Sequence, residues 1–257
     1  DDPNQSTTCG RPLLRDGQAV VAPVAEGRRD WRAAGHPVVG GLDADDRKFA
    51  ADYWLECAVL EHASIASFSH FALDLMRLGA PPELLAGAHR AALDEIEHAR
   101  LCFALASGYA GVPVGPGPLS SAVVDGDGSA MQIAEALFRE GCIGETLAAV
   151  DAAARLAVAR DGAVRSALAV ILKDESEHAA LAWRALRWIL ASDDGAIRRH
   201  LDRVLAEERE RWTADLPGDS VSDALQTHGL LPATARTREL RRAFDDVITP
   251  SWIALGT

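Results

Sequence analysis

An acid-rich block that contains histidine occurs twice in this 257-residue chain, as "DEIEHA" at residues 94–99 and as "DESEHA" at residues 174–179. Each copy is embedded in a stretch rich in Ala and Leu, where apolar residues recur at the three- and four-residue spacing of an amphipathic helix. Glu95 with His98, and Glu175 with His178, are three positions apart and therefore share one helix face. In both helices that face is the apolar stripe expected to point into the core. The fold must therefore compensate for charge placed in an apolar interior.

Helix-period patterns run almost without a break from residue 43 to about residue 191. Capping residues, Pro and Gly divide this stretch into four long helices, expected at about 43–78, 82–111, 129–160 and 163–191. Short connections make the first two an antiparallel hairpin, and the last two another. About 22 residues rich in Gly and Pro join the hairpins, enough to run the length of a helix. The pattern predicts an all-α four-helix bundle with one long crossover.

The segments on either side of the bundle differ from it in composition. Residues 1–42 contain Pro and Gly at short intervals, which predicts an extended arm rather than helix or sheet. Residues 43–191 form the predicted bundle. Residues 192–257 are expected to be a helical extension that packs on the bundle, with helices near 196–212 and 234–247.

The remaining two helices each carry one acid on an otherwise apolar stripe, Glu61 in the first and Glu145 in the third. Four carboxylates and two imidazoles should therefore meet in one core. The alternative is that these residues lie on solvated faces, but two matching motifs and two isolated acids in register argue against it. Buried carboxylates cost several kcal/mol each unless paired, and two divalent cations would compensate for them.

With these residues the chain resembles the ferritin-like di-iron carboxylate superfamily, over about residues 45–190. The blocks "LEHASIASF" and "EGCIGET" also resemble uncharacterised bacterial ferritin-like domain proteins. The resemblance implies a ferritin-like bundle with six metal ligands, Glu61, Glu95, His98, Glu145, Glu175 and His178. The form D-E-x-x-H resembles the oxygen-activating branch, in which the Asp hydrogen-bonds a ligand histidine. This role would fall to Asp94 and Asp174, which otherwise are ordinary exposed acids.

Mixed Glu and His ligation suits iron, or alternatively manganese, better than zinc or calcium. The resemblance implies two iron ions with O₂ as co-substrate. The expected function is a non-haem di-iron oxidase or oxygenase that oxidises an unidentified organic substrate. The alternatives are a ferroxidase or iron-storage protein, a dimanganese catalase, and a binding or scaffolding protein with an idle site.

Glycines and cysteines near the expected ligands are candidates for a pocket. Gly141 and Gly144 either leave room for O₂ or substrate, with a π-bulge, or allow close helix packing. Cys57, Cys102 and Cys142 each lie about one turn from an expected ligand. A Cys57–Cys102 disulfide, a thiol-lined access route and small buried hydrophobes are all open readings of these cysteines.

The net charge of −12 argues against a nucleic-acid partner, and no apolar run approaches the length of a membrane span. The expected partners are a small-molecule or peptide substrate and an external electron donor, with the chain a monomer or small homo-oligomer. No C-x-x-C pair is present among the four cysteines. The first residue is not Met, which fits removal of a signal peptide or of a tag, so a cytoplasmic and an exported protein are both compatible.

Overall fold

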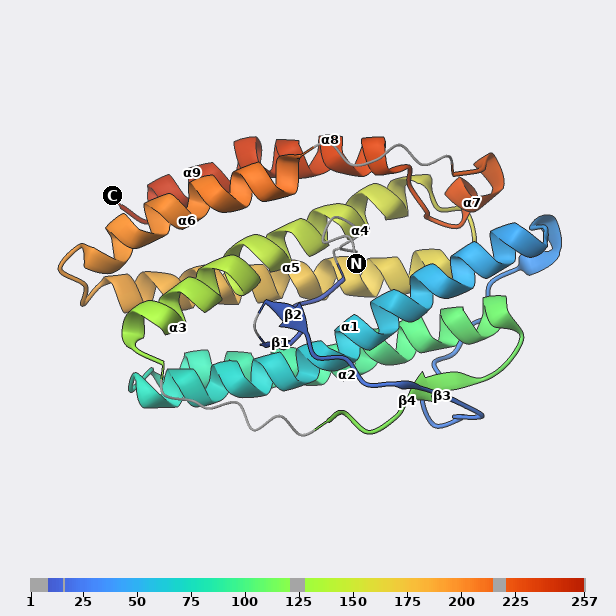
Figure 1. Cartoon of the computed structure of the whole chain (residues 1–257), viewed down its shortest axis with the longest axis horizontal. Coiled ribbons are helices and arrows are strands. Elements are labelled where there is room, and N and C mark those ends of the chain that lie inside the picture. Colours follow the sequence, from blue (N-terminus) through green and yellow to red (C-terminus); the bar gives the residue numbers. More distant parts are fainter. Residues whose placement is uncertain (1–8, 16, 121–127, 215–220, 257) are drawn as a thin grey trace.

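The computed structural model describes residues 9–15, 17–120, 128–214 and 221–256 (Figure 1). It is 72% helix and 4% strand, so the predicted all-α class is confirmed. Four long rods run side by side in Figure 1, and further helices cover them on one side. The rods are α1 (Ala44–Arg77), α2 (Pro82–Ala110), the continuous segment α3 (Ala130–Ala136), η2 (Leu137–Glu145) and α4 (Thr146–Val158), and α5 (Gly162–Leu190).

The rods begin where the capping residues predict. The Asp43 side chain accepts a hydrogen bond from a backbone N–H in the first turn of α1. Pro82 occupies the first position of α2, where its missing N–H has no helical partner to lose. Ser129 and Gln132 form a capping box at the start of α3, each side chain bonding the other's backbone N–H.

The third rod is not the single α-helix that its periodicity predicts. Nine residues, Leu137–Glu145, form a π-helix between α3 and α4, which bears out the expectation of a π-bulge beside the glycines. A π-helix packs an extra residue into each turn, so it rotates the side chains that follow it around the helix axis. Glu145, the acid of this rod, is its last residue.

Neighbouring rods meet along four interfaces, here called seams. At three of them the backbones pack closely: α1 packs on α2, α2 packs on α5, and α5 packs on η2 and α4. In the described residues α1 makes no comparable packing against η2 or α4. The N-terminal segment runs between these elements instead, as Figure 1 shows. Leu13 donates its backbone N–H to the carbonyl of Ala63 in α1 at 3.3 Å, and the Arg11 side chain reaches Glu140 in η2. The arm thus completes the fourth seam.

The prediction that the arm forms no sheet was wrong in part. The strand β1 (Leu14–Arg15) pairs antiparallel with β2 (Gln18–Ala19). Further along, β3 (Val24–Glu26) pairs antiparallel with β4 (Val114–Pro116) of the crossover. Strands this short leave no alternating pattern in the sequence, and the second pairing joins segments that are distant in the chain.

The apolar core has two parts, separated along the rods by a polar layer. One part contains Phe68 and Leu75 of α1 with Phe138 of η2. The other contains Trp54 of α1 and Phe103 of α2. Between them along α1 lies Glu61, which is the place where the sequence puts the acids and histidines.

Beyond the rods, the expected helix near 196–212 is α6 (Ala196–Thr213). The one expected near 234–247 is α8 (Ala233–Ala243), continued by η3 (Phe244–Ile248) and α9 (Thr249–Ala254). A short helix, α7 (Asp223–Thr227), was not expected. Side chains of α6, α8 and α9 share the apolar cluster of η2 and α5, so this segment packs on the rods. No helix in the described residues is long and apolar enough to cross a membrane.

Asp161 offers a test of how the arm is joined to the rods. Its carboxylate caps α5 by accepting from Ala163 and Val164, and its other oxygen accepts the backbone N–H of Val38 in the arm. We expect Asp161→Ala to lower the free energy of unfolding by about 1–2 kcal/mol, measured by urea denaturation. Asp52→Ala, which removes an exposed ion pair with Lys48, should change it by less than about 0.5 kcal/mol. Equal losses in the two variants would contradict the capping role.

Candidate metal centre

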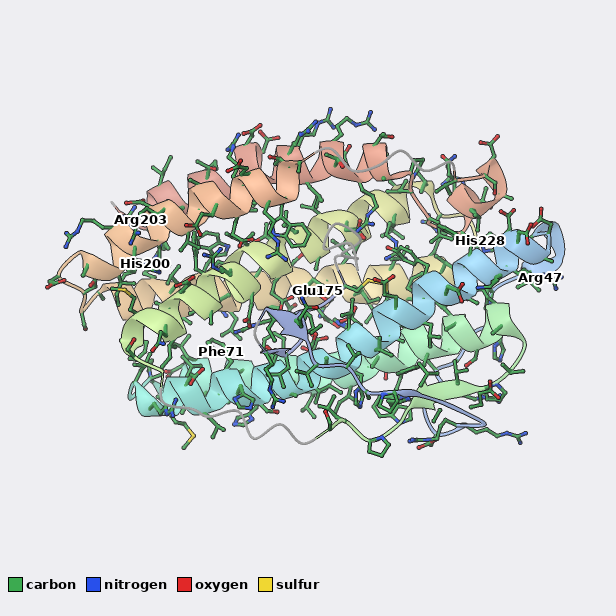
Figure 2. All side chains as sticks on the ribbon, in the orientation of Figure 1. Arg47, Phe71, Glu175, His200, Arg203 and His228 are labelled. Atoms are coloured by element: carbon green, nitrogen blue, oxygen red, sulfur yellow. A yellow bond between two sulfur atoms is a disulfide. The ribbon has the colours of Figure 1, made fainter. Side chains whose placement is uncertain are left out.

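Six side chains, the six expected ligands, meet halfway along the rods, where Figure 2 labels Glu175. They form two groups whose ligand atoms lie within 4.8 Å of one another. Glu61 and His98 belong to one group only, Glu145 and His178 to the other, and Glu95 and Glu175 to both. Each group therefore has three carboxylates and one imidazole. If two ions bind here, Glu95 and Glu175 would be the carboxylates within reach of both.

All six side chains are shielded from solvent, with none more than 3% exposed. Each rod contributes at least one of them, because each presents its apolar stripe to the same interior. Glu95 and His98 follow each other on one face of α2, and Glu175 and His178 on one face of α5. The reading that these residues lie on solvated faces is therefore wrong.

These buried groups lack the partners that buried polar atoms normally have. Both carboxylate oxygens of Glu95, Glu145 and Glu175 make no hydrogen bond. The same holds for Oε2 of Glu61 and for Nδ1 of His98 and His178. Buried polar atoms in proteins are nearly always satisfied, and an unsatisfied one costs about 1–3 kcal/mol, more when charged. Nine such atoms that all face one centre indicate a partner that the polypeptide itself does not supply.

The two imidazoles present Nδ1 to the carboxylates. Nδ1 of His178 lies 3.2 Å from Oε1 of Glu95 and 3.6 Å from Oε2 of Glu175. Nδ1 of His98 lies 3.5 Å from Oε2 of Glu95 and 3.6 Å from Oε1 of Glu175. These nitrogen and oxygen atoms are close together but form no hydrogen bonds with one another. Metal-ligand atoms arranged around a common point have this geometry.

The opposite nitrogen of each ring is held by an aspartate from the other hairpin. Nε2 of His98 lies 3.3 Å from Oδ2 of Asp174, and Nε2 of His178 lies 3.2 Å from Oδ2 of Asp94. A carboxylate beside Nε2 accepts a hydrogen bond from the Nε2–H group, which keeps the proton on Nε2 and leaves the lone pair on Nδ1, facing the centre. Asp94 and Asp174 therefore contact the histidines as the resemblance implied, and they do so crosswise between α2 and α5.

Burial and like charge set the protonation of the site. Burial, with Glu95 and Glu175 nearby, raises the pKa of Glu61 well above its ordinary value, and burial with Glu175 does the same for Glu145. Burial alone would raise the pKa of Glu95, but His98 and His178 lower it. Burial alone would lower the pKa of each histidine, but the surrounding carboxylates raise it. A cation that binds here therefore competes with protons for the same atoms.

The donor set fits two divalent ions of the iron or manganese type. Four carboxylates balance the charge of two such ions, and the histidines add neutral nitrogen donors. Zinc favours four ligands with more nitrogen or sulfur, and calcium takes oxygen ligands only. The residues present would thus hold a carboxylate-bridged pair.

A small cavity reaches the centre from one side. It has a volume of about 10 Å³, room for about one water-sized molecule. Its lining joins the ligands Glu61 and Glu175 to a group of sulfur atoms and to a buried Asp–Arg pair. The residues involved besides these two ligands include Cys9, Trp54, Cys57, Cys102, Asp151 and Arg155. A larger cavity of about 400 Å³, lined by Leu78, Trp188 and Ile197 among others, lies at an end of the rods away from the ligands.

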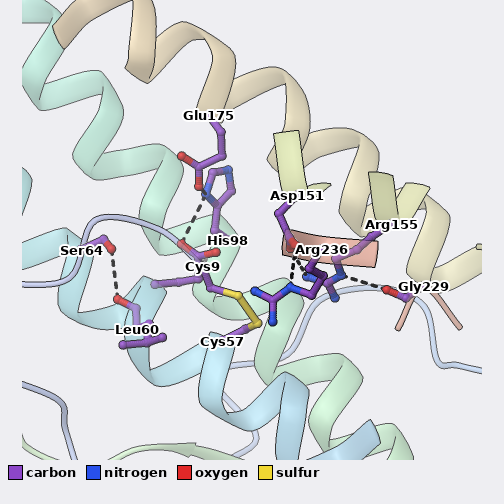
Figure 3. Close-up of a disulfide and its surroundings, with 11 residues drawn as sticks. Cys9, Cys57, Leu60, Ser64, His98, Asp151, Arg155, Glu175, Gly229 and Arg236 are labelled. Carbon is purple, nitrogen blue, oxygen red and sulfur yellow. Dashed lines mark hydrogen bonds and ion pairs between the residues drawn. A yellow bond between two sulfur atoms is a disulfide. The ribbon is translucent and has the colours of Figure 1, made fainter. Parts of the chain in front are cut away.

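The cysteines are arranged differently from the pairing considered for Cys57 and Cys102. Cys57 forms a disulfide with Cys9 of the arm (Figure 3). Cys102 and Cys142 are free and buried. A Cys57–Cys102 bond is therefore wrong, because the Cys57 sulfur is already bonded. Burial and Glu61 raise the pKa of the Cys102 thiol, so it stays neutral beside the centre. Cys142 packs in the apolar core as a small hydrophobe.

Gly141 of η2 provides close packing rather than open space. A Cβ at Gly141 would lie 2.8 Å from the Cβ of Ala182 in α5 and 3.1 Å from Leu137. A Cβ at Gly144 would meet only the carbonyl of Arg139 in its own helix, at an ordinary contact distance of 3.4 Å. Of the two readings of Gly141, the structure favours helix packing, because α5 and the arm occupy the space that a side chain would need.

Two features of the site were not expected from the sequence. Cys9 and Gly10 of the arm lie against the centre, and Asp151 and Arg155 line its cavity. Arg155 donates from Nε to the Gly229 carbonyl at 2.9 Å. Asp151 and Arg155 could have been found from the sequence, because they are charged residues in an apolar helix, as Glu145 is. The position of the arm could not have been found, because its sequence has no helix or strand periodicity.

Comparison with protein-family models, curated proteins and solved structures returned no match.

Replacing one carboxylate ligand with the corresponding amide separates two effects on stability, the cost of the buried charge and the gain from bound metal. We expect divalent metal at about 100 times its Kd to stabilise the protein by about 2.7 kcal/mol, a rise in Tm of about 5–10 °C for a chain of this size. In Glu61→Gln this rise should largely disappear. The metal-free Tm should not fall, because the variant removes a buried carboxylate that has too few partners. Differential scanning calorimetry with Mn²⁺ measures both values.

Glu56→Gln is the matched control, since Glu56 lies on the same helix five positions earlier and is exposed. It should retain the full metal-dependent rise. An undiminished rise in Glu61→Gln would contradict the assignment of Glu61 as a ligand.

The crosswise aspartates should affect affinity without being ligands. Asp174→Ala removes the group that holds the Nε2 proton of His98, so we expect metal affinity to fall about 10–100-fold. Competition with a fluorescent chelator measures the change. Glu97→Ala, which removes a half-buried residue paired with Arg100 on the same helix as His98, should leave affinity within about twofold. Equal affinity in Asp174→Ala and wild type would show that the contact has no such role.

Proposed function

We propose that the protein is a ferritin-like di-iron protein that reacts with O₂, an oxidoreductase acting on an organic substrate. The observation that supports this most is the pair of matching groups, each with three carboxylates and one histidine and two carboxylates in common. A pair of ferrous ions held by these residues would supply electrons for the reduction of O₂.

The protein's own residues would contribute three properties. Glu95 and Glu175, common to both groups, would hold the ions close together, and Glu61 and Glu145 would each complete one side. Asp94 and Asp174 would keep the imidazoles in one tautomer. The apolar clusters above and below the ligands would exclude bulk water, which strengthens electrostatic interactions within the site.

A second function is favoured by one observation, the size of the cavity at the centre. About 10 Å³ admits a molecule the size of water or O₂ but not an organic compound of ordinary size. Iron oxidation without an organic substrate, as in a ferroxidase, is therefore the alternative. Peroxide disproportionation by a dimanganese form is a third reading, with less in its favour.

The experiment is to load the protein with Fe²⁺ without oxygen and then follow O₂ consumption with an electrode. We expect faster consumption than by the same amount of free Fe²⁺. For an oxidase or oxygenase it should stop once the bound iron is oxidised and resume when an external reductant is added. For a ferroxidase, excess Fe²⁺ should sustain it and yield ferric mineral.

Glu145→Gln is the control, because it removes a proposed ligand from one group and leaves the other group intact. Protein loaded with Zn²⁺ provides a redox-inactive comparison. Consumption no faster than that of free Fe²⁺ would refute the proposal. Rapid disproportionation of peroxide by Mn²⁺-loaded protein would favour the catalase.

A further inference from the structure

Residues 9–13 of the N-terminal arm form one wall of the metal centre. They enter the seam where α1 does not pack closely on η2 or α4. Cys9, Arg11 and Leu13 are each less than 9% exposed, although they precede the first helix by some thirty residues. The arm therefore inserts into the protein instead of lying on its surface.

Gly10 makes the closest approach to a proposed ligand. Its backbone has φ of +62°, in the left-handed region that favours glycine. A Cβ built on it would lie 2.6 Å from the Ser64 hydroxyl and closer still to Oε2 of Glu61. Only glycine can bring the backbone this near, so the arm directly covers the Glu61 carboxylate.

Arg11 fills the next part of the seam. Its guanidinium lies over the rings of Phe68 and Phe71, 5.5 and 4.9 Å from their centroids, and Nε donates to Glu140 at 3.3 Å. Its Nη1 is buried and makes no hydrogen bond. An incompletely satisfied buried charge contributes little net stability. Arg11 by itself therefore does little to keep this segment attached to the rods.

The Cys9–Cys57 disulfide supplies that attachment. Cys57 lies one turn before Glu61 on α1, and the bond closes a separation of 48 residues (Figure 3). Both cysteines line the small cavity that leads to Glu61 and Glu175. A cross-link that closes so long a loop strongly favours the docked arrangement of the arm. Whether the disulfide is oxidised or reduced should therefore affect the size of the cavity.

We propose that the Cys9–Cys57 disulfide is a redox-controlled latch that holds Gly10 and Arg11 over the metal pair and so determines which molecules reach it. The inference rests on the proposed metal centre. With the latch closed, molecules the size of water or O₂ enter freely and metal ions exchange only slowly. With the latch reduced, the arm leaves the seam, and metal ions and an organic substrate gain access beside Glu61.

Reduction proceeds by thiol–disulfide exchange with an external dithiol. Its thiolate attacks Cys9, which is 6% exposed while Cys57 is fully buried, and the Cys57 sulfur leaves and takes a proton. The second thiol of the reductant then attacks the mixed disulfide and releases Cys9 as a thiol. Two electrons and two protons pass to the protein, and the reductant becomes a disulfide. The reverse exchange closes the latch.

The test uses Co²⁺, which is visible by its absorbance and avoids oxygen chemistry. Excess EDTA is added to the Co²⁺-loaded full-length chain, with and without prior treatment with a phosphine reductant. Titratable thiols should rise from the two free cysteines to all four. We expect the rate of metal loss to rise by about tenfold or more, because opening of the seam no longer requires breaking a cross-link.

Variants separate the latch from a general effect of the reductant. Cys9→Ser should lose Co²⁺ quickly without reductant and respond no further to it. Cys142→Ala, which removes a free cysteine of the apolar core that does not line the cavity, should remain slow until reduced. Circular dichroism checks that each variant is folded.

Hydrogen exchange gives a readout that needs no metal. The Leu13 amide, which bonds the Ala63 carbonyl, should exchange faster in the metal-free protein after reduction. Four thiols with unchanged metal loss and unchanged Leu13 exchange would overturn the latch and leave the metal centre standing. Absence of Co²⁺ binding would refute the proposed function, and Leu13 exchange would still decide the latch.

Discussion

Burial of four carboxylates in one apolar interior is the constraint on which the rest of the fold depends. Glu61, Glu95, Glu145 and Glu175 lie between two hydrophobic clusters, and most of their oxygens have no hydrogen-bond donor. Such an arrangement is unfavourable without positive charge, because desolvation and mutual repulsion both oppose it. Partly protonated acids and charged histidines reduce the repulsion in the metal-free chain, and two divalent cations would remove it. The rods can therefore pack closely at both ends, whereas the stability of their middle depends on the protons or cations bound there.

The contacts around the histidines tie the two hairpins together. Each hairpin provides one imidazole and the aspartate that holds the imidazole of the other, Asp174 for His98 and Asp94 for His178. A shift of α2 along α5 would break both contacts at once, because they run in opposite directions between the same two helices. The repeated block thus sets the alignment of the helices as well as the donor atoms. This explains physically why the aspartate and the histidine recur together in one short motif.

Much of the centre could be predicted from the sequence because local periodicity determines it. Glu61 and Glu145 stand out as the charged residues on apolar stripes, and the motif spacing places Glu and His on one face. The caps at Asp43 and Ser129 mark where rods begin. The arm could not be placed in this way, since a disulfide across 48 residues and a three-residue strand pairing with the crossover are long-range contacts without a repeating pattern. Of the open readings of the cysteines, the Cys57–Cys102 bond is excluded for the same reason, because the partner of Cys57 is in the arm.

The arm also bears on which chemistry the centre supports. A bundle with one wide seam exposes its interior there, and an enzyme that admits an organic substrate needs such an opening. Here Gly10 and Arg11 fill the seam, and the space left beside the ligands is that of a single small molecule. A permanently closed seam would suit the oxidation of iron, whereas a seam that opens would suit an organic substrate. The Cys9–Cys57 disulfide attaches the arm one helical turn from Glu61. In the proposed latch, whether the seam is closed or open depends on whether this disulfide is oxidised or reduced. The choice between the two proposed functions therefore depends on the same few residues that close the site.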